Sequence, residues 1–257
     1  MTNKKVDSDL TRKQFLKLSG AAAGMSVLTS SGLGGLASAQ TNDLLHRPIH
    51  STGEMIPAVG LGTASDRFGS MGSNDDFMKR RGAVEALIAG GGSVIDTSPT
   101  YRGAEAVVGR ALDELQMRDQ CFLATKTSIY GKQEGIEQNA KSFDALRTNS
   151  FDLLQVHNLK DTNDHLETIY GLKEDGKVRY VGITHVRSRL NNDAVQFIEN
   201  NELDFIQCQY NMIDRSIENR VLPAAREHGV AVMVNVPFGR GRLFRATAGQ
   251  DIPEWSR

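Results

Sequence analysis

From Ile56 onward, short β-branched runs alternate with longer amphipathic patterns, and this alternation constrains the fold more than any other feature of the sequence. Apolar residues at three- and four-residue spacing indicate helices, whereas short apolar runs bounded by polar residues or glycine indicate buried strands. Repeated strand–helix alternation is typical of a parallel sheet with crossover helices. The predicted strands span residues 58–64, 93–97, 121–126, 151–157, 178–184, 205–210 and 230–236.

The segments between these strands decide between two parallel architectures. Helices are predicted over residues 78–89, 104–115, 136–146, 166–174, 194–200 and 219–228, and residues 47–54 are predicted to form a small hairpin under the sheet. An open doubly wound sheet usually carries a glycine fingerprint after its first strand. The Gly60–Gly62 segment lacks the third glycine and a following helix start, so it predicts a tight turn beside a ligand. The predicted fold class is therefore an α/β protein, a (β/α)8 TIM barrel whose eighth strand and C-terminal loop are missing from this chain.

The composition removes several functional classes. The chain has 257 residues and a formal net charge of -1, so nucleic acid is not an expected partner. No linker-like stretch follows position 45, which predicts a single barrel domain over residues 40–257. Cys121 and Cys208 belong to no metal-ligand or disulfide pattern, so both are expected to be unpaired thiols and no metal site is predicted.

Residues 1–39 differ from the rest of the chain and resemble a processing segment. A polar, basic stretch precedes a mildly apolar run over residues 18–36, and Ala37-Ser38-Ala39 then supplies an A-x-A cleavage site. The apolar run is interrupted by Gly and Ser, so no stable membrane span is expected after processing. An export signal peptide is the prediction, and an anchoring or disordered tail is the alternative.

The basic stretch also suggests the export route. The segment from Thr11 to Lys17 resembles the twin-arginine signal pattern, with Lys13 in place of the second arginine. That route carries folded proteins with their cofactors. It predicts a periplasmic protein of a bacterium, with the general secretory route as the alternative.

Four ionisable residues follow successive predicted strands: Asp96, Tyr101, Lys126 and His157. Taken singly, each has an ordinary structural explanation, such as a helix cap, a solvated strand end or a core histidine. In a parallel barrel, however, the carboxyl ends of the strands meet at one mouth, where active sites are built. The four residues are therefore predicted to form one catalytic group.

The sequence around these residues resembles the aldo-keto reductase family. The segment from Asp96 to Glu105, with Gly109 following, resembles the signature Asp-x-x-x-x-Tyr-Gly-x-x-Glu, with Arg102 in place of the glycine. Ala124-Thr125-Lys126 and Leu154-Gln155-Val156-His157 are similar to that family's lysine and histidine motifs. The resemblance runs from about residue 47 to residue 244. It implies an NAD(P)H-dependent oxidoreductase that reduces the carbonyl group of a small-molecule aldehyde or ketone.

These residue types suit that chemistry, because hydride addition to a carbonyl carbon needs a proton on the oxygen. Tyr101 is the predicted general acid. The Lys126 ammonium is expected to favour the ionised form of Tyr101, and Asp96 is expected to hold that ammonium in place. His157 is expected to hydrogen-bond the carbonyl oxygen and orient it.

The resemblance also implies a nicotinamide site, for NADPH or alternatively NADH. Gln207 matches the family's carboxamide-binding glutamine, and Thr184 and His185 occupy the place of its Ser-Asn pair. The segment after the seventh predicted strand resembles the loop that covers the pyrophosphate, where backbone amides and an arginine meet the charge. Its predicted contacts are Phe238, Gly239, Arg240 and Gly241. Asn235, just before this loop, occupies the place where the family often stacks a tyrosine on the nicotinamide.

The absent eighth strand predicts a truncated gene product or fragment, and the complete barrel is expected to be a monomer. Two alternatives to an active reductase remain at this stage. One is a cofactor-binding regulatory subunit, and the other is an inactive truncated homologue. An intact catalytic group favours the enzyme.

Overall fold

The computed structural model describes residues 44–65, 67–70, 72–251 and 254–256. The predicted export signal over residues 1–39 lies outside the described residues. Within the described ranges, no helix combines the length and the apolar character needed to cross a bilayer.

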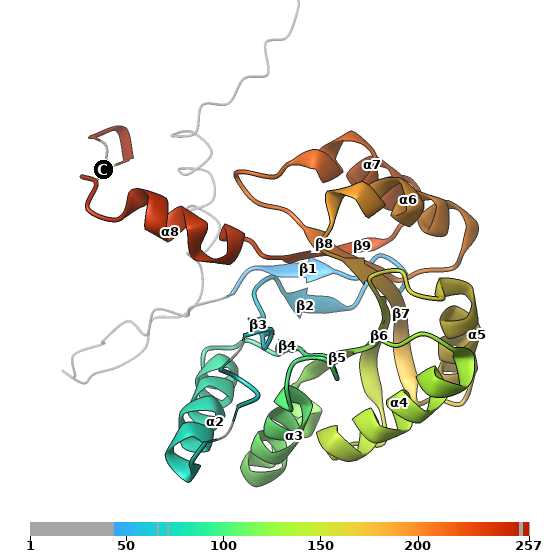
Figure 1. Cartoon of the computed structure of the whole chain (residues 1–257), viewed down its shortest axis with the longest axis horizontal. Coiled ribbons are helices and arrows are strands. Elements are labelled where there is room, and N and C mark those ends of the chain that lie inside the picture. The colour runs from blue at the N-terminus through green and yellow to red at the C-terminus, as the bar shows by residue number, and fades with distance from the viewer. Residues whose placement is uncertain (1–43, 66, 71, 252–253, 257) are drawn as a thin grey trace, which may run out of the picture. The chain divides into compact units, whose positions relative to one another are not determined.

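A seven-stranded parallel sheet forms the centre of the fold, and its strands follow one another in chain order (Figure 1). Each strand pairs with the next one along the chain. Among the described residues, the first and last strands of this sheet are not paired with each other, so a gap separates them. The strands are β3 (Leu61–Gly62), β4 (Val94–Asp96), β5 (Phe122–Thr127), β6 (Phe151–His157), β7 (Val178–His185), β8 (Phe205–Gln209) and β9 (Ala231–Asn235).

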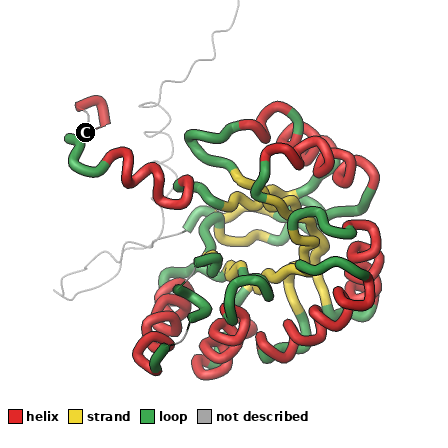
Figure 2. The backbone as a smooth tube through the Cα atoms, viewed as in Figure 1, coloured by secondary structure: helices red, strands yellow, loops and turns green. Residues whose placement is uncertain are grey.

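Helices connect the strands and lie outside the curved sheet, as Figure 2 shows. Their inward faces pack with the outward faces of the strands in one large apolar cluster. The connecting helices are α2 (Asn74–Ala89), α3 (Ala104–Leu115), α4 (Lys132–Leu146), α5 (Thr162–Glu174), α6 (Asn191–Asn200) and α7 (Val221–Glu227), and α8 (Arg242–Thr247) follows β9. Short 3-10 helices span Arg118–Gln120, Ser188–Leu190, Ser216–Asn219, Gly239–Gly241 and Glu254–Ser256. The predicted barrel-type α/β architecture is confirmed.

A second apolar cluster fills the interior of the sheet and closes its lower end. The rings of Phe122, Tyr180 and Phe205 lie with their centroids 5.8–5.9 Å apart. Beneath them, β1 (His46–Pro48) and β2 (Met55–Pro57) form the predicted hairpin. Ile49 from this hairpin is fully buried in the same cluster. We call these three rings and Ile49 the aromatic floor.

Several element boundaries differ from prediction for local reasons. Helices α2, α4, α5 and α6 begin three or four residues before the predicted starts, because their first turns are mostly polar and carry no apolar periodicity. Helix α7 begins at Val221 because Arg220, with φ -140° and ψ -43°, is not helical.

The predicted tight turn at Gly60–Gly62 is wrong, because Leu61 and Gly62 form β3. At Gly60 a side chain would lie 2.8 Å from Cβ of Val94. The glycine therefore allows the chain to approach β4 closely. The strand has only two residues, and both pair with β4.

Both cysteines are free and buried, as expected. Burial raises the pKa of Cys121 to about 11 and that of Cys208 to about 12. Because the thiolate is the reactive form, roughly one Cys121 thiol in a thousand is ionised at pH 8. We expect neither cysteine to react with iodoacetamide at pH 8 until denaturant is added. Mass spectrometry checks this, and rapid alkylation of the native protein would contradict the buried positions.

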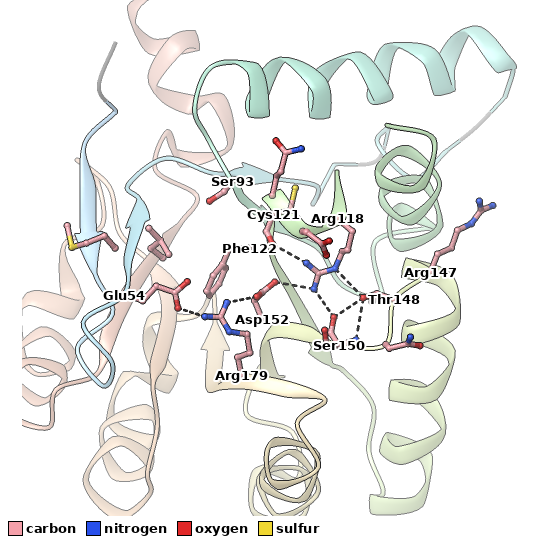
Figure 3. A pocket seen from close by; sticks show the side chains of 15 residues that line it. Glu54, Ser93, Arg118, Cys121, Phe122, Arg147, Thr148, Ser150, Asp152 and Arg179 are labelled. Atoms are coloured by element: carbon pink, nitrogen blue, oxygen red, sulfur yellow. Dashed lines mark hydrogen bonds and ion pairs between the residues drawn. The ribbon is translucent and has the colours of Figure 1, made fainter. Parts of the chain in front are cut away.

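A cavity of about 580 Å³ lies at the amino ends of the strands (Figure 3). Charged side chains on its wall pair with one another. Asp152 bridges two arginines, at 3.2 Å from Arg118 and 2.7 Å from Arg179, and Arg179 also pairs with Glu54. The Glu54–Arg179–Asp152 contacts join the hairpin to β6 and β7. Active sites of such barrels lie at the opposite end of the strands, so we assign this cluster a role in stability.

Candidate active site

The four predicted catalytic residues lie at the carboxyl ends of neighbouring strands. Asp96 ends β4, Lys126 lies in the last part of β5, and His157 ends β6. Parallel register brings these ends level, since Asp96 pairs with Ala124 two residues before Lys126. Tyr101 lies in the loop between β4 and α3. The structure therefore brings together the residues that the sequence predicted.

The Lys126 ammonium is held by two oxygen atoms. Its Nζ lies 2.6 Å from Oδ1 of Asp96 and donates to the backbone oxygen of Thr97 at 2.7 Å. The side chain is only 1% exposed, so its charge is screened little by water. The predicted role of Asp96 in holding the ammonium agrees with this geometry.

Tyr101 faces both Lys126 and His157. Nζ of Lys126 lies 5.3 Å from the centroid of the Tyr101 ring. The Tyr101 and His157 rings lie 6.1 Å apart at 88°. The phenol is thus placed beside a cation and a neutral hydrogen-bonding ring.

A left-handed turn places the tyrosine loop before α3. Arg102 and Gly103 have φ values of 50° and 84°. Glycine adopts such a conformation without steric cost, which gives a physical reason for the glycine in the family signature at the position of Arg102. In this chain Arg102 itself adopts the left-handed conformation.

The pKa of Tyr101 differs from the sequence-based expectation in direction. Burial raises the pKa of the phenol above its ordinary value, and the nearby Lys126 charge opposes this without overcoming it. Lys126 thus lowers the pKa as predicted, but desolvation is the larger effect. In the protein as it stands, Tyr101 is protonated at neutral pH and is ready to donate.

His157 is neutral in the folded protein. Burial, followed by the positive charges of Lys126 and Lys160, lowers its pKa to about 3. Its Nδ1 atom lies 2.8 Å from Oγ of Ser128 and 3.4 Å from Oγ of Ser98. His157 can therefore offer a substrate oxygen a hydrogen bond from a neutral ring.

The lowered pKa of His157 predicts a pH dependence of stability. In the unfolded chain this imidazole binds a proton near pH 6.5, whereas in the folded protein it does so near pH 3. The unfolded state therefore binds more protons in this window, and stability falls as pH decreases from about 6.5 towards 3. The slope is at most about 1.4 kcal/mol per pH unit. Urea unfolding at pH 7 and pH 5 should show a smaller difference for His157→Gln than for the parent, and equal differences would contradict it.

Glu105 and Gly109 of the signature lie on α3 and fix its packing against β5 and α4. Glu105 is buried and accepts hydrogen bonds from Thr125 at 2.5 Å and Ser142 at 3.1 Å. It thereby joins α3 to β5 and α4, next to Lys126. A side chain at Gly109 would lie 2.3 Å from the backbone oxygen of Ala145, so glycine allows α3 to approach α4.

Of the three predicted carboxamide-binding residues, Thr184 and Gln207 contact each other. Oγ1 of Thr184 donates to Oε1 of Gln207 at 3.0 Å, and the two residues are paired in neighbouring strands. Nε2 of Gln207 lies 3.2 Å from the sulfur of Met233. His185 is buried, and burial lowers its pKa. No hydrogen bond of the described residues joins His185 to Thr184 or Gln207.

The predicted pyrophosphate loop follows β9 directly. Gly239 is buried, and Arg240 is close enough to Tyr101 for its charge to lower the pKa of the phenol. Arg240 and Gly241 have positive φ values of 55° and 77°. Phe238 is 53% exposed and packs on Phe244, with ring centroids 5.0 Å apart. Asn235 ends the strand, and its buried Oδ1 atom has no hydrogen-bond partner among the described residues.

Three contributors to the site were missed from sequence. They are Ser128 and Ser98, which contact His157, and Lys160, which acts on its charge. All three lie outside regular elements, where no periodicity marks them. The position of Ser128, two residues after Lys126 and on the same side of the extended chain, was the one available signal.

Comparison with known proteins agrees with this geometry. The chain is 25% identical over 241 residues to the NADH-specific methylglyoxal reductase of Escherichia coli, covering 82% of this chain and 72% of that protein. It is 30% identical over 210 residues to the aldo-keto reductase YhdN of Bacillus subtilis, covering 76% and 62%.

A solved aldo-keto reductase structure is also similar to this chain. An aldo-keto reductase of Klebsiella pneumoniae in complex with NADPH superposes with a TM-score of 0.68 at 26% identity, covering 80% of this chain and 72% of that one. The chain thus spans between three fifths and three quarters of the lengths of these proteins. The aldo/keto reductase family model matches residues 58–254, more than half of the sequence. The chain belongs to the aldo/keto reductase family.

Proposed function

We propose that this protein is an NAD(P)H-dependent reductase of small aldehydes or ketones, with Tyr101 as the general acid. The observation that carries the proposal is the Lys126 ammonium, buried and fixed by Asp96 at 2.6 Å, 5.3 Å from the Tyr101 ring. A buried cation beside a tyrosine has a specific use in proton transfer, because it stabilises the phenolate left behind.

The reaction adds a hydride to the carbonyl carbon and a proton to its oxygen. The nicotinamide cofactor supplies the hydride when it is bound. Tyr101 donates the phenolic proton as negative charge develops on the oxygen, which yields the alcohol. Lys126 stabilises the resulting phenolate, which regains its proton from solvent. His157 donates a hydrogen bond to the same oxygen and so fixes the direction of attack.

The residues around β7 to β9 fit a nicotinamide cofactor. The buried Oδ1 atom of Asn235 is without a partner among the described residues and is suited to a ligand hydrogen-bond donor. Thr184 and Gln207 lie together on the neighbouring strands and can hold a carboxamide. Arg240 and the backbone of its loop can meet the pyrophosphate charge. The Escherichia coli relative is named as NADH-specific and the Klebsiella pneumoniae structure contains NADPH, so both cofactors need testing.

The direct test is the rate of NADPH and NADH oxidation, followed by absorbance, with a panel of small aldehydes and ketones. We expect turnover with at least one aldehyde and formation of the matching alcohol. Tight cofactor binding without turnover across the panel would instead support the regulatory alternative. Absence of both binding and turnover would support an inactive homologue.

We also propose that residues 1–39 direct export to the periplasm. The twin-arginine-like segment from Thr11 to Lys17 and the Ala37-Ser38-Ala39 sequence support this proposal. A fusion of residues 1–45 to a fluorescent reporter that folds before export should reach the periplasm in a bacterium with this route. Retention of the fusion in the cytoplasm would overturn the proposal, and Arg12→Lys is the matched variant that should be retained.

A further inference from the structure

The contact between Ser128 and His157 has no role in the reaction as described so far. Oγ of Ser128 lies 2.8 Å from Nδ1 of His157, and Ser128 is only 6% exposed. The other ring nitrogen, Nε2, makes no hydrogen bond with the described residues. The ring thus has one nitrogen held by the protein and one left for a ligand.

Two neighbouring elements fix the Ser128 backbone. Its N–H donates to Oε1 of Gln138 on α4 at 2.6 Å. Its carbonyl oxygen accepts from Nζ of Lys160, in the loop after β6, at 3.2 Å. Hydrogen bonds to its N–H and to its carbonyl oxygen therefore hold the Ser128 backbone at the end of β5. Such bracing is typical of a residue whose position matters for a neighbouring group.

The direction of the hydrogen bond follows from the available partners. A neutral imidazole has one donor and one acceptor nitrogen. Among the described residues, the Ser128 hydroxyl has no acceptor other than Nδ1 of His157. A buried hydroxyl proton needs an acceptor, so Ser128 donates and Nδ1 accepts. The ring proton is then on Nε2.

Ser98 is the competing hydroxyl and is less suited to this role. Its oxygen lies 3.4 Å from Nδ1, which is longer than the Ser128 contact. It also accepts from the backbone N–H of Thr100 and lies 3.0 Å from the Thr100 hydroxyl. Ser98 therefore has another acceptor for its proton, whereas Ser128 has none among the described residues.

We propose that Ser128 is a positioning residue that holds His157 in the tautomer protonated on Nε2, so that this N–H points to the substrate oxygen. The catalytic consequence rests on the proposed function. Without the Ser128 hydroxyl, Nδ1 can carry the proton and donate to Ser98. Nε2 then presents a lone pair to the substrate oxygen and repels it.

The tautomer can be measured without any reaction. Two-bond ¹⁵N–¹H correlation spectra of the ¹⁵N-histidine-labelled full chain at pH 7 distinguish protonated from unprotonated ring nitrogens. We expect His157 to be protonated on Nε2 in the parent, and Ser128→Ala to shift a large fraction to the Nδ1 form. Ser128→Thr keeps the hydroxyl and should restore the parent pattern. Ser98→Ala is the matched control and should leave the tautomer unchanged.

Kinetics then test the consequence. Ser128→Ala should lower kcat for aldehyde reduction by about tenfold with the cofactor KM unchanged, and Ser128→Thr should recover most of it. An Nδ1-protonated parent, or a tautomer that responds to Ser98→Ala but not to Ser128→Ala, would overturn the proposal. A reactive Tyr101→Phe variant would overturn the proposed function instead, while leaving the spectral result intact. Near-native circular dichroism of each variant separates these outcomes from misfolding.

Discussion

Replacing Tyr101 by Phe is expected to lower the rate of carbonyl reduction by about 10²–10⁴-fold, the usual contribution of a general acid. The substitution removes only the hydroxyl that donates the proton. The ring would remain 5.3 Å from the Lys126 ammonium and would still face His157. Cofactor affinity should therefore change little. Stopped-flow or steady-state oxidation of NADPH with the preferred aldehyde measures the rate, and fluorescence titration measures the affinity.

Tyr170→Phe is the matched control for this loss. Tyr170 lies on α5, and its hydroxyl donates to the backbone oxygen of Glu202 at 3.2 Å, away from the four predicted catalytic residues. The Tyr170→Phe variant should reduce the aldehyde within about twofold of the parent rate, because a substitution far from the site has a small effect. Equal rates for Tyr101→Phe and the parent would contradict the assignment of Tyr101 as the acid.

Adding an eighth strand and its helix after Arg257, copied from the Bacillus subtilis relative, is expected to stabilise the protein substantially. Among the described residues, β3 and β9 each have one edge without a pairing strand, which leaves backbone hydrogen-bonding groups exposed there. The outward-facing Val232 and Val234 are 37% and 41% exposed, although they lie in a strand. Burying the exposed parts of these two side chains contributes about 1–2 kcal/mol, which corresponds to a rise in melting temperature of roughly 5 °C for a domain of this size.

The same addition should change association and cofactor binding. Residues 40–257 alone are expected to self-associate as concentration rises, because open strand edges pair with other chains. Sedimentation velocity measures this, and the extended protein should remain monomeric and bind NADPH more tightly. Hydrogen exchange provides a local readout, since the amides of Val232 and Val234, which alternate with those facing β8, should gain protection. An unchanged melting temperature with unprotected β9 amides would show that the added strand does not occupy the gap.

Strands that are buried along their whole length could be predicted from sequence. The extent of the edge strand β3 and the first residues of the helices could not. Strand β6 matches its predicted bounds because it is buried along its whole length between two paired neighbours. Strand β3 is much shorter than predicted, because among the described residues only Leu61 and Gly62 pair with β4. Helix starts were predicted late since first turns are polar, and acidic residues there are favoured by the helix dipole rather than by packing.

The site shows the same division. Asp96, Lys126 and His157 could be placed because parallel strands end at one mouth, whatever the exact strand lengths. The direction in which the Tyr101 pKa shifts could not be predicted, because it depends on whether burial outweighs the Lys126 charge. Ser128 and Lys160 could not be found either, since their roles depend on a three-dimensional contact with His157 that no sequence spacing encodes.

The aromatic floor has a consequence for the side from which a ligand can approach. Phe122, Tyr180 and Phe205 fill the interior beneath the catalytic residues, and Ile49 and the hairpin close the end below them. The aromatic floor therefore blocks an approach to Asp96, Tyr101, Lys126 and His157 from the amino ends of the strands, so a ligand reaches them from the carboxyl-end side. Under the proposed function, a terminal carbonyl can approach from that side with the rest of the molecule directed away from the floor.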